Sequence, residues 1–206
     1  MILGVVTGAD DLQAAAELER EAVALPPGLD IRWLGVSGYR LTYDDVSLFI
    51  DPYVSRVPLR SLLLRRTALP DPEMIARYGQ APGAVAGVLV GHTHFDHAVD
   101  APALARVHQT KAYGSASLVH LMRLHGLQEQ AVEVATHQRY ELGPFVVTFI
   151  PSRHSKLLFG RKVPFDGPLT CDHLAGLAPG AYKCGAVYGI RIEVAGLSIY
   201  HQAAPT

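Results

Sequence analysis

Hydrophobic residues in this chain gather in short runs that are separated by glycine, proline and acidic residues. Residues 39–43, 46–50 and 84–90 form three such runs, rich in β-branched and aromatic side chains, which is typical of buried strands. Asp44-Asp45 joins the first two runs and predicts a hairpin turn. The same reasoning predicts further strands at residues 31–35, 111–113, 132–134, 138–141, 145–150, 186–194 and 197–200.

Stretches of helical composition lie before and between these strands. The predicted helices occupy residues 9–24, 72–78, 102–108 and 115–125. Pro26-Pro27-Gly28 ends the first helix and Gly126 ends the last. Strands that alternate with helices predict a layered α/β (α+β) domain. We therefore expect an N-terminal leader with an accessory helix at residues 1–28 and one folded domain at residues 29–206.

Two stretches lack the pattern of a regular core element. Residues 54–67 carry arginines among leucines, which fits a solvated helix face as well as a face that contacts anions or a membrane. Residues 156–185 are rich in glycine and proline and show no strand or helix periodicity. Long irregular segments of this kind often form lids or rims beside a site at strand ends.

Composition narrows the class of protein. With 206 residues, of which 49% are hydrophobic and 18% charged, the chain can bury a sizeable core and does not resemble a disordered protein. The formal net charge of −1 gives no overall field that attracts nucleic acid, so we expect no nucleic-acid partner. No stretch is long enough to span a membrane. Two cysteines make no disulfide framework, which favours a reducing compartment and a cytoplasmic location. Cys171 and Cys184 are expected as free thiols, with pairing or a metal site that includes His173 left open.

A cluster of metal-binding residue types directly follows the strand at residues 84–90. Within six positions lie three imidazoles and one carboxylate, from His92, His94, Asp96 and His97. Neutral imidazole is the commonest protein ligand for zinc and similar metals, and a carboxylate supports a second ion or orients water. The ends of strands are also where α/β folds commonly place their chemistry. The sequence therefore predicts a metal site here.

The spacing His92-x-His94-x-Asp96-His97 resembles the HxHxDH signature of the metallo-β-lactamase superfamily. The resemblance covers residues 31 to 206 and implies an αββα sandwich, with two mixed sheets flanked by helices. It implies that His92 and His94 bind one metal ion, and that Asp96 and His97 bind a second.

Two further residues follow strands in positions that the family uses. His154 comes after the run at residues 145–150 and would complete a three-histidine site with His92 and His94. Asp51 ends the run at residues 46–50 and would accept a hydrogen bond from a ligand histidine and fix its tautomer. The settings His154-Ser155 and Asp51-Pro52 are most similar to those of the lactonase-like hydrolases of the superfamily.

The resemblance weakens toward the end of the chain. Ala204 stands roughly where the family has an aspartate that bridges two metals, and no later histidine follows. We therefore expect one ion, Zn²⁺ with Mn²⁺ or Fe as alternatives, held by three histidines and water. A second ion would be weakly bound or absent, with His201 as a further candidate ligand. An incomplete second sheet would expose an apolar face and an unpaired edge. Another copy of the chain would cover this surface, the N-terminal helix would shield part of it, or the sequence is a truncated relative.

These residues predict a metal-dependent hydrolase that acts on a small molecule. Metal-activated water would attack an ester, lactone, amide or phosphodiester, and Asp96 would act as the catalytic residue that orients the nucleophile and accepts its proton. One alternative is a truncated, catalytically weak metal-binding protein that acts through an interface. Another is a nucleic-acid phosphodiesterase, which the near-neutral net charge disfavours.

Overall fold

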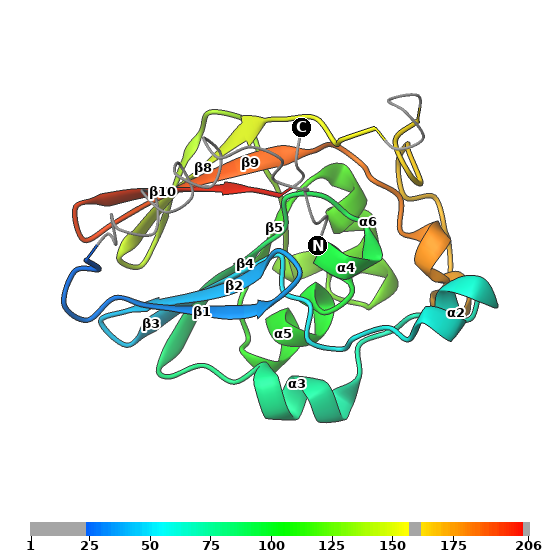
Figure 1. Ribbon diagram of the computed structural model, residues 1–206, viewed down its shortest axis with the longest axis horizontal. Coiled ribbons are helices and arrows are strands. Elements are labelled where there is room, and N and C mark those ends of the chain that lie inside the picture. Colours follow the sequence, from blue (N-terminus) through cyan, green and yellow to red (C-terminus); the bar gives the residue numbers. More distant parts are fainter. Residues whose placement is uncertain (1–23, 157–161, 204–206) are drawn as a thin grey trace, which may run out of the picture.

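Two stacked β-sheets form the centre of the molecule (Figure 1). The computed structural model describes residues 24–156 and 162–203. The first sheet has the spatial order β1-β2-β3-β4-β5-β6, with strands at Asp30–Gly35, Gly38–Tyr43, Val46–Ile50, Ala84–Leu89, Ala112–Gly114 and Ala131–Glu133. The second sheet has the order β10-β9-β8-β7, with strands β7 to β10 at Arg139–Leu142, Phe145–Pro151, Tyr188–Val194 and Leu197–Gln202.

The helices are short. Helices α2 to α6 span Leu59–Leu63, Pro72–Tyr78, Phe95–Ala98, Ala101–Val107 and Ala116–Leu124, and 3₁₀ turns η1 to η3 span Gln128–Gln130, Leu174–Gly176 and Pro179–Ala181. The predicted helix at residues 72–78 is α3, where the side chain of Asp71 accepts the N–H of Glu73 at 2.9 Å. The predicted helices at residues 102–108 and 115–125 correspond to α5 and α6. The helix predicted at residues 9–24 lies, apart from its last position, outside the described residues.

The topology of the first sheet brings two loops together at one edge. Strands β1, β2 and β3 pair antiparallel, whereas β3, β4, β5 and β6 pair parallel through helical crossovers. Parallel neighbours end at the same edge of a sheet. Asp51, directly after β3, therefore lies beside the loop at residues 91–97 that follows β4.

Both faces of the first sheet are buried at its central strands β3 and β4. Leu48, Ile50 and Leu89 point into the core between the two sheets, while their neighbours Phe49 and Val88 point toward the helices. The alternation explains why β3 and β4 read as nearly continuous hydrophobic runs in the sequence. Each of these side chains contributes about 1.5–3 kcal/mol by its burial, so the strands before the two loops are firmly held.

The second sheet differs from the expectation of two mixed sheets. All its described strand pairs are antiparallel. Two of the three pairings have a local cause, because the Gly143-Pro144 and Ala195-Gly196 turns form hairpins, and a hairpin reverses the chain direction. The third pairing, of β8 with β9, joins strands separated by residues 152–187. Helices α5 and α6 pack mainly against strands β4, β5 and β6 of the first sheet, and the described residues place no helix on the outer face of the second (Figure 1).

Two other expectations concern cysteines and membranes. Cys171 and Cys184 are free, and burial raises the pKa of the Cys184 thiol to about 11. Neither cysteine joins a ligand group with metal-site geometry among the residues described. Within residues 24–156 and 162–203, no helix is long and apolar enough to cross a membrane.

Candidate metal centre

Three histidines from two distant loops converge. His92 and His94 follow β4, and His154 follows β8. One nitrogen from each ring lies within 4.8 Å of the others, and the ring centroids are 4.6 to 5.0 Å apart. Two rings bound to one tetrahedral zinc at 2.0–2.1 Å have nitrogens about 3.3 Å apart. The observed separation of 3.0 Å between His92 Nε2 and His94 Nδ1 is close to that value.

Backbone carbonyls orient two of the three rings. His94 Nε2 lies 2.8 Å from the carbonyl oxygen of Pro164, and His154 Nδ1 lies 2.8 Å from that of Ser155. A carbonyl only accepts, so each of these nitrogens carries the proton. Neutral His94 then has its lone pair on Nδ1, and neutral His154 has its lone pair on Nε2. These are the nitrogens that can bind a metal. His92 Nδ1 is buried without a hydrogen-bond partner.

Burial keeps two of these imidazoles neutral, the form that binds metal. Burial lowers the pKa of His92 to about 2, and the charge of His97 acts in the same direction. Burial also lowers the pKa of His94 to about 4, with a smaller effect of His154. At neutral pH both rings therefore offer lone pairs without first losing a proton.

Asp51 lies behind this cluster as a fully buried carboxylate. Its Oδ1 accepts the Gly91 N–H at 2.7 Å, and its Oδ2 lies 3.0 Å from His97 Nδ1 and 2.9 Å from His201 Nε2. Burial alone would raise the pKa of Asp51, but His97 and His201 hold it well below its usual range. Although burial lowers the pKa of His97, the Asp51 carboxylate raises it above its ordinary value. Asp51 thus accepts a hydrogen bond from His201 and forms a close contact with His97, while its expected role toward a ligand histidine stays a prediction.

Asp96 and His97 lie beside the three-histidine group and are not part of it. The His97 ring lies tilted against the ring of His92, with centroids 3.9 Å apart. Asp96 is 33% exposed at its side chain, and its Oδ2 lies 3.9 Å from His97 Nε2. The ligand roles expected for Asp96 and His97 stay predictions. His201, expected as a further ligand, contacts the buried carboxylate, and Ala204 lies outside the described residues.

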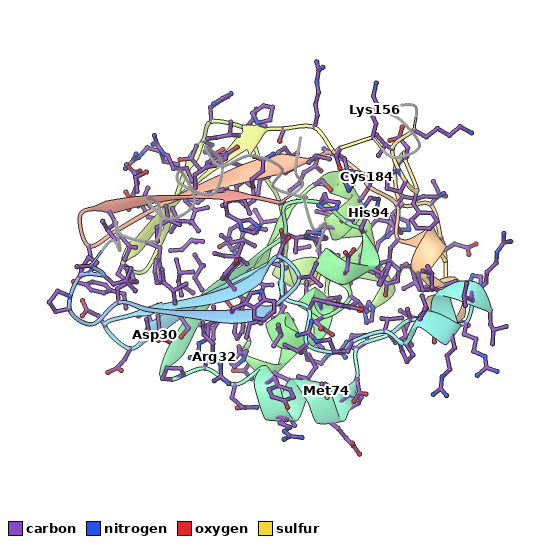
Figure 2. All side chains as sticks on the ribbon, in the orientation of Figure 1. Asp30, Arg32, Met74, His94, Lys156 and Cys184 are labelled. Atoms are coloured by element: carbon purple, nitrogen blue, oxygen red, sulfur yellow. The ribbon has the colours of Figure 1, made fainter. Side chains whose placement is uncertain are left out.

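The irregular segment before β9 covers one side of the cluster. The Phe165 ring packs edge-on against His94, with centroids 6.2 Å apart. Thr93 N–H donates to the Cys184 carbonyl at 3.0 Å, and Figure 2 shows His94 and Cys184 together at this end of the molecule. Sequence reasoning expected a rim from residues 156–185 but did not single out Pro164 or Phe165, because their role depends on a tertiary contact that no motif encodes.

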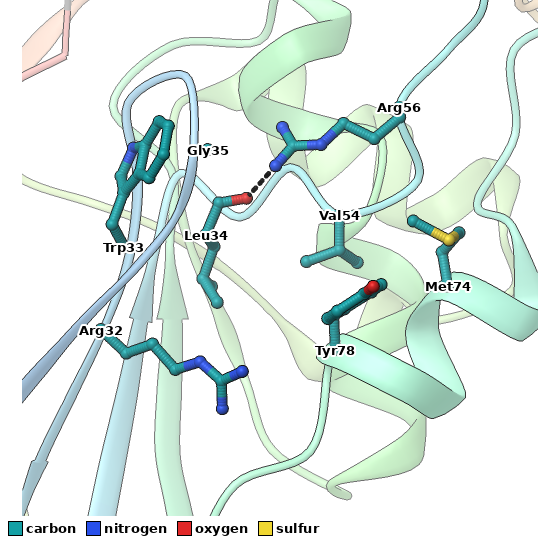
Figure 3. Close-up of a pocket in the computed structure, with 8 residues that line it drawn as sticks. All are labelled: Arg32, Trp33, Leu34, Gly35, Val54, Arg56, Met74 and Tyr78. Atoms are coloured by element: carbon teal, nitrogen blue, oxygen red, sulfur yellow. Dashed lines mark hydrogen bonds between the residues drawn. The ribbon is translucent and has the colours of Figure 1, made fainter.

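A cavity of about 340 Å³ elsewhere on the molecule contains none of these histidines (Figure 3). It lies between the end of β1, the loop after Asp51 and α3. Arg56 donates from its guanidinium to the Leu34 carbonyl at 2.7 Å across this cavity and lies 5.4 Å from the centre of the Tyr53 ring. Its guanidinium is thereby committed to structural contacts, so the histidine cluster is the stronger candidate for chemistry.

Comparison with known protein families shows which family the chain belongs to. Residues 47–203, which hold every histidine described above, match the beta-lactamase superfamily domain. The chain belongs to this superfamily. The family membership that the HxHxDH spacing suggested is therefore confirmed.

Two relatives of the chain are named as metal-dependent hydrolases. A UPF0173 metal-dependent hydrolase of Polynucleobacter asymbioticus is 28% identical over 141 residues, which are 66% of this chain and 46% of that protein. A protein of the same name from Paracoccus denitrificans is 26% identical over 151 residues, or 72% of this chain and 56% of that protein. The chain thus spans about half the length of the curated relatives it matches.

Solved structures show the same fold. Igni18, a metallo hydrolase from Ignicoccus hospitalis, is similar with a TM-score of 0.52 and 17% identity, covering 84% of this chain and 60% of its own. CmlA, a diiron beta-hydroxylase from Streptomyces venezuelae, has a TM-score of 0.53 and 14% identity, covering 93% and 32%. These two proteins carry different chemistries on one fold, so function has to be argued from the site.

Proposed function

We propose that this chain is a metal-dependent hydrolase that binds one zinc ion through His92, His94 and His154 and acts on a small molecule. The observation that carries the proposal is the convergence of three imidazole nitrogens within 4.8 Å, two of them on buried rings. The names of the superfamily relatives, metal-dependent hydrolases, support the same reaction class.

The donor set fits a catalytic ion. Three histidines leave one position of a tetrahedral site open for water, which is the arrangement of catalytic zinc sites. When bound, such an ion supplies Lewis acidity that makes hydroxide available near neutral pH. Carbonyls of Pro164 and Ser155 hold two rings in the tautomer this requires, and Phe165 shields one side of His94 from water.

The neighbouring carboxylates have separate roles in this proposal. Asp96 is partly exposed and adjoins the cluster, so it can orient the attacking water and accept its proton. Asp51 is fully buried and cannot reach solvent, so its role is to position His97 and the Gly91 backbone beside the ligands. Assays have to determine whether the scissile bond is an ester, lactone, amide or phosphodiester.

Metal analysis of the purified chain tests the site. After equilibration with Zn²⁺ and desalting, the wild type should retain about one equivalent. The His154→Ala variant should lose most of it, because only two of the three donors remain. His173→Ala is the matched control, since His173 lies exposed beside Asp172 outside the cluster. Equal zinc in all three proteins would refute the proposed ligand set.

Turnover is tested separately with ester, lactone and phosphodiester reporters. The zinc-loaded wild type should be active on at least one class, and Asp96→Asn should lower kcat by about 10²–10⁴-fold, the usual contribution of a positioned acid–base group. The zinc content of this variant should stay unchanged, because Asp96 is outside the three-histidine group.

Inactivity of the zinc-loaded wild type across all reporters would favour a second candidate, a metal-binding protein that acts through an interface. The observation behind it is that the described residues contain one ligand group and no second one. The resemblance to the superfamily implied a second ion at Asp96 and His97, which was expected to be weakly bound or absent. Zinc as the metal and a cytoplasmic location stay predictions.

A further inference from the structure

Helix α2 carries an exposed hydrophobic and basic surface that the histidine site does not use. Leu59, Leu63 and Leu64 are 69%, 74% and 61% exposed, and the helix has no buried residue. Leu59 and Leu63 are four residues apart, so they share one face of the helix. Leucines exposed to this degree are costly to keep in water unless something covers them.

The charge around these leucines has one sign. Arg60, Arg65 and Arg66 are exposed on and directly after α2, and no aspartate or glutamate occurs between Asp51 and Asp71. We call the three leucines and these three arginines the α2 surface. Positive charge interleaved with protruding leucines is complementary to a layer that offers anions at its surface and hydrocarbon beneath.

The α2 surface is fixed to the rest of the fold. Thr67 Oγ1 donates to the Ala175 carbonyl at 2.7 Å, and the Ala68 N–H donates to the Leu177 carbonyl at 2.7 Å. Figure 1 shows α2 at one end of the molecule, opposite the turns that join β2 to β3 and β9 to β10. The leucines therefore project from an anchored position.

The α2 surface also connects to the histidine cluster. A cavity of about 390 Å³ adjoins it, lined by Leu62 of α2, by Arg65 directly after α2, and by Phe165 and Lys183 from the segment before β9. Phe165 is the residue whose ring packs on His94. Arg65 and Lys183 give this cavity two cations, so a phosphate group held there would lie one aromatic ring away from the cluster.

We propose that the α2 surface binds the surface of an anionic phospholipid bilayer, with its leucines inserted among the acyl chains and its arginines on the phosphates. A stable protein–protein contact needs roughly 20–30 residues on each side, far more than this five-residue helix offers. Shallow insertion into lipid needs only a few hydrophobic side chains flanked by cations. This binding does not depend on the reaction proposed above.

Vesicle co-sedimentation of the full chain tests the proposal. The chain should pellet with vesicles of equimolar phosphatidylcholine and phosphatidylglycerol, and remain in solution with phosphatidylcholine alone. Replacing Leu59 and Leu63 together by serine should lower the partition coefficient about 100-fold, since burying one leucine contributes about tenfold. Replacing the three arginines by glutamine should lower it by about two orders of magnitude, at roughly fivefold for each charge. Since α2 has no buried residue, these variants should keep the fold.

A leucine on another part of the surface provides the control. Leu25 is exposed as well and lies outside α2, so Leu25→Ser should bind vesicles like the wild type. Equal binding by Leu59→Ser/Leu63→Ser and the wild type would overturn the proposal, as would no binding of the wild type to anionic vesicles. A concentration-dependent dimer that the same leucine variant abolishes, without vesicle binding, would assign the surface to a second copy of the chain and also overturn it.

Discussion

The buried carboxylate of Asp51 allows a sharp test of how the centre is held together. In the Asp51→Asn variant the side chain keeps its shape but loses its charge. In the wild type, Oδ2 lies 3.0 Å from His97 Nδ1 and 2.9 Å from His201 Nε2. The variant presents an amide to these two rings, so protonated His97 loses its counterion inside the protein.

The size of the effect follows from complete burial. Removing one partner of a buried ion pair costs about 3–5 kcal/mol, because the other charge stays desolvated. For a domain of 150–250 residues, each kcal/mol lowers Tm by about 2–4 °C, so we expect a fall of roughly 6–20 °C. Asp51 raises the pKa of His97, so this contribution is full below the ordinary pKa of histidine and is lost as pH rises through the raised value.

Thermal and urea unfolding with a chelator present measure the effect without metal. Asp51→Asn should cost more near pH 6, below the ordinary pKa of histidine, than at alkaline pH, where His97 loses its proton. Asp96→Asn is the matched control, because its partly exposed carboxylate should change stability by less than about 1 kcal/mol. If Asp51→Asn unfolds like this control at both pH values, the pairing of Asp51 with His97 does not stabilise the fold.

Three further changes test separate parts of the structure. Gly91→Ala would place a Cβ against that of Ala203, and should cost about 1–3 kcal/mol in urea unfolding. Burial, together with Arg106, lowers the pKa of His125 to about 4, so wild-type stability present above pH 6.5 should fall as pH drops toward 4. In His125→Gln that fall should be smaller by about 2 kcal/mol near pH 4.5, as compared by urea unfolding at the two pH values. Tyr182→Phe should cost about 1–2 kcal/mol of unfolding free energy, because the buried hydroxyl donates to a backbone carbonyl at 2.7 Å.

The strands and helices of the first sheet could be predicted because their signals are local. The runs at residues 46–50 and 84–90 are continuous and hydrophobic since the sheet is buried on both faces. The helix at residues 72–78 has an aspartate cap before it. The mixed second sheet that the family resemblance implied was wrong. The Ala195-Gly196 turn predicts the antiparallel pairing of β9 with β10, whereas the pairing of β8 with β9 spans residues 152–187 and has no local signal.

The sequence predicted which three histidines converge, but not the contacts that hold the surrounding residues. His92, His94 and His154 follow strands, and strand ends are visible in a sequence. The contact of His201 with Asp51 is not, since a histidine after a strand fits a metal ligand as well as a partner of a buried carboxylate. Pro164 and Phe165 carry no pattern, because an irregular segment is placed by packing alone.

The contact between Asp51 and His201 joins positions 150 residues apart in the sequence. Because a chain is synthesised from its N-terminus, β3 leaves the ribosome well before β10. The Asp51 carboxylate therefore lacks this partner until residue 201 has emerged. Closing so long a loop costs chain entropy that only the packed sheets offset. A nascent chain from which all three histidines of the cluster have emerged therefore still lacks the contact between Asp51 and His201 beside them.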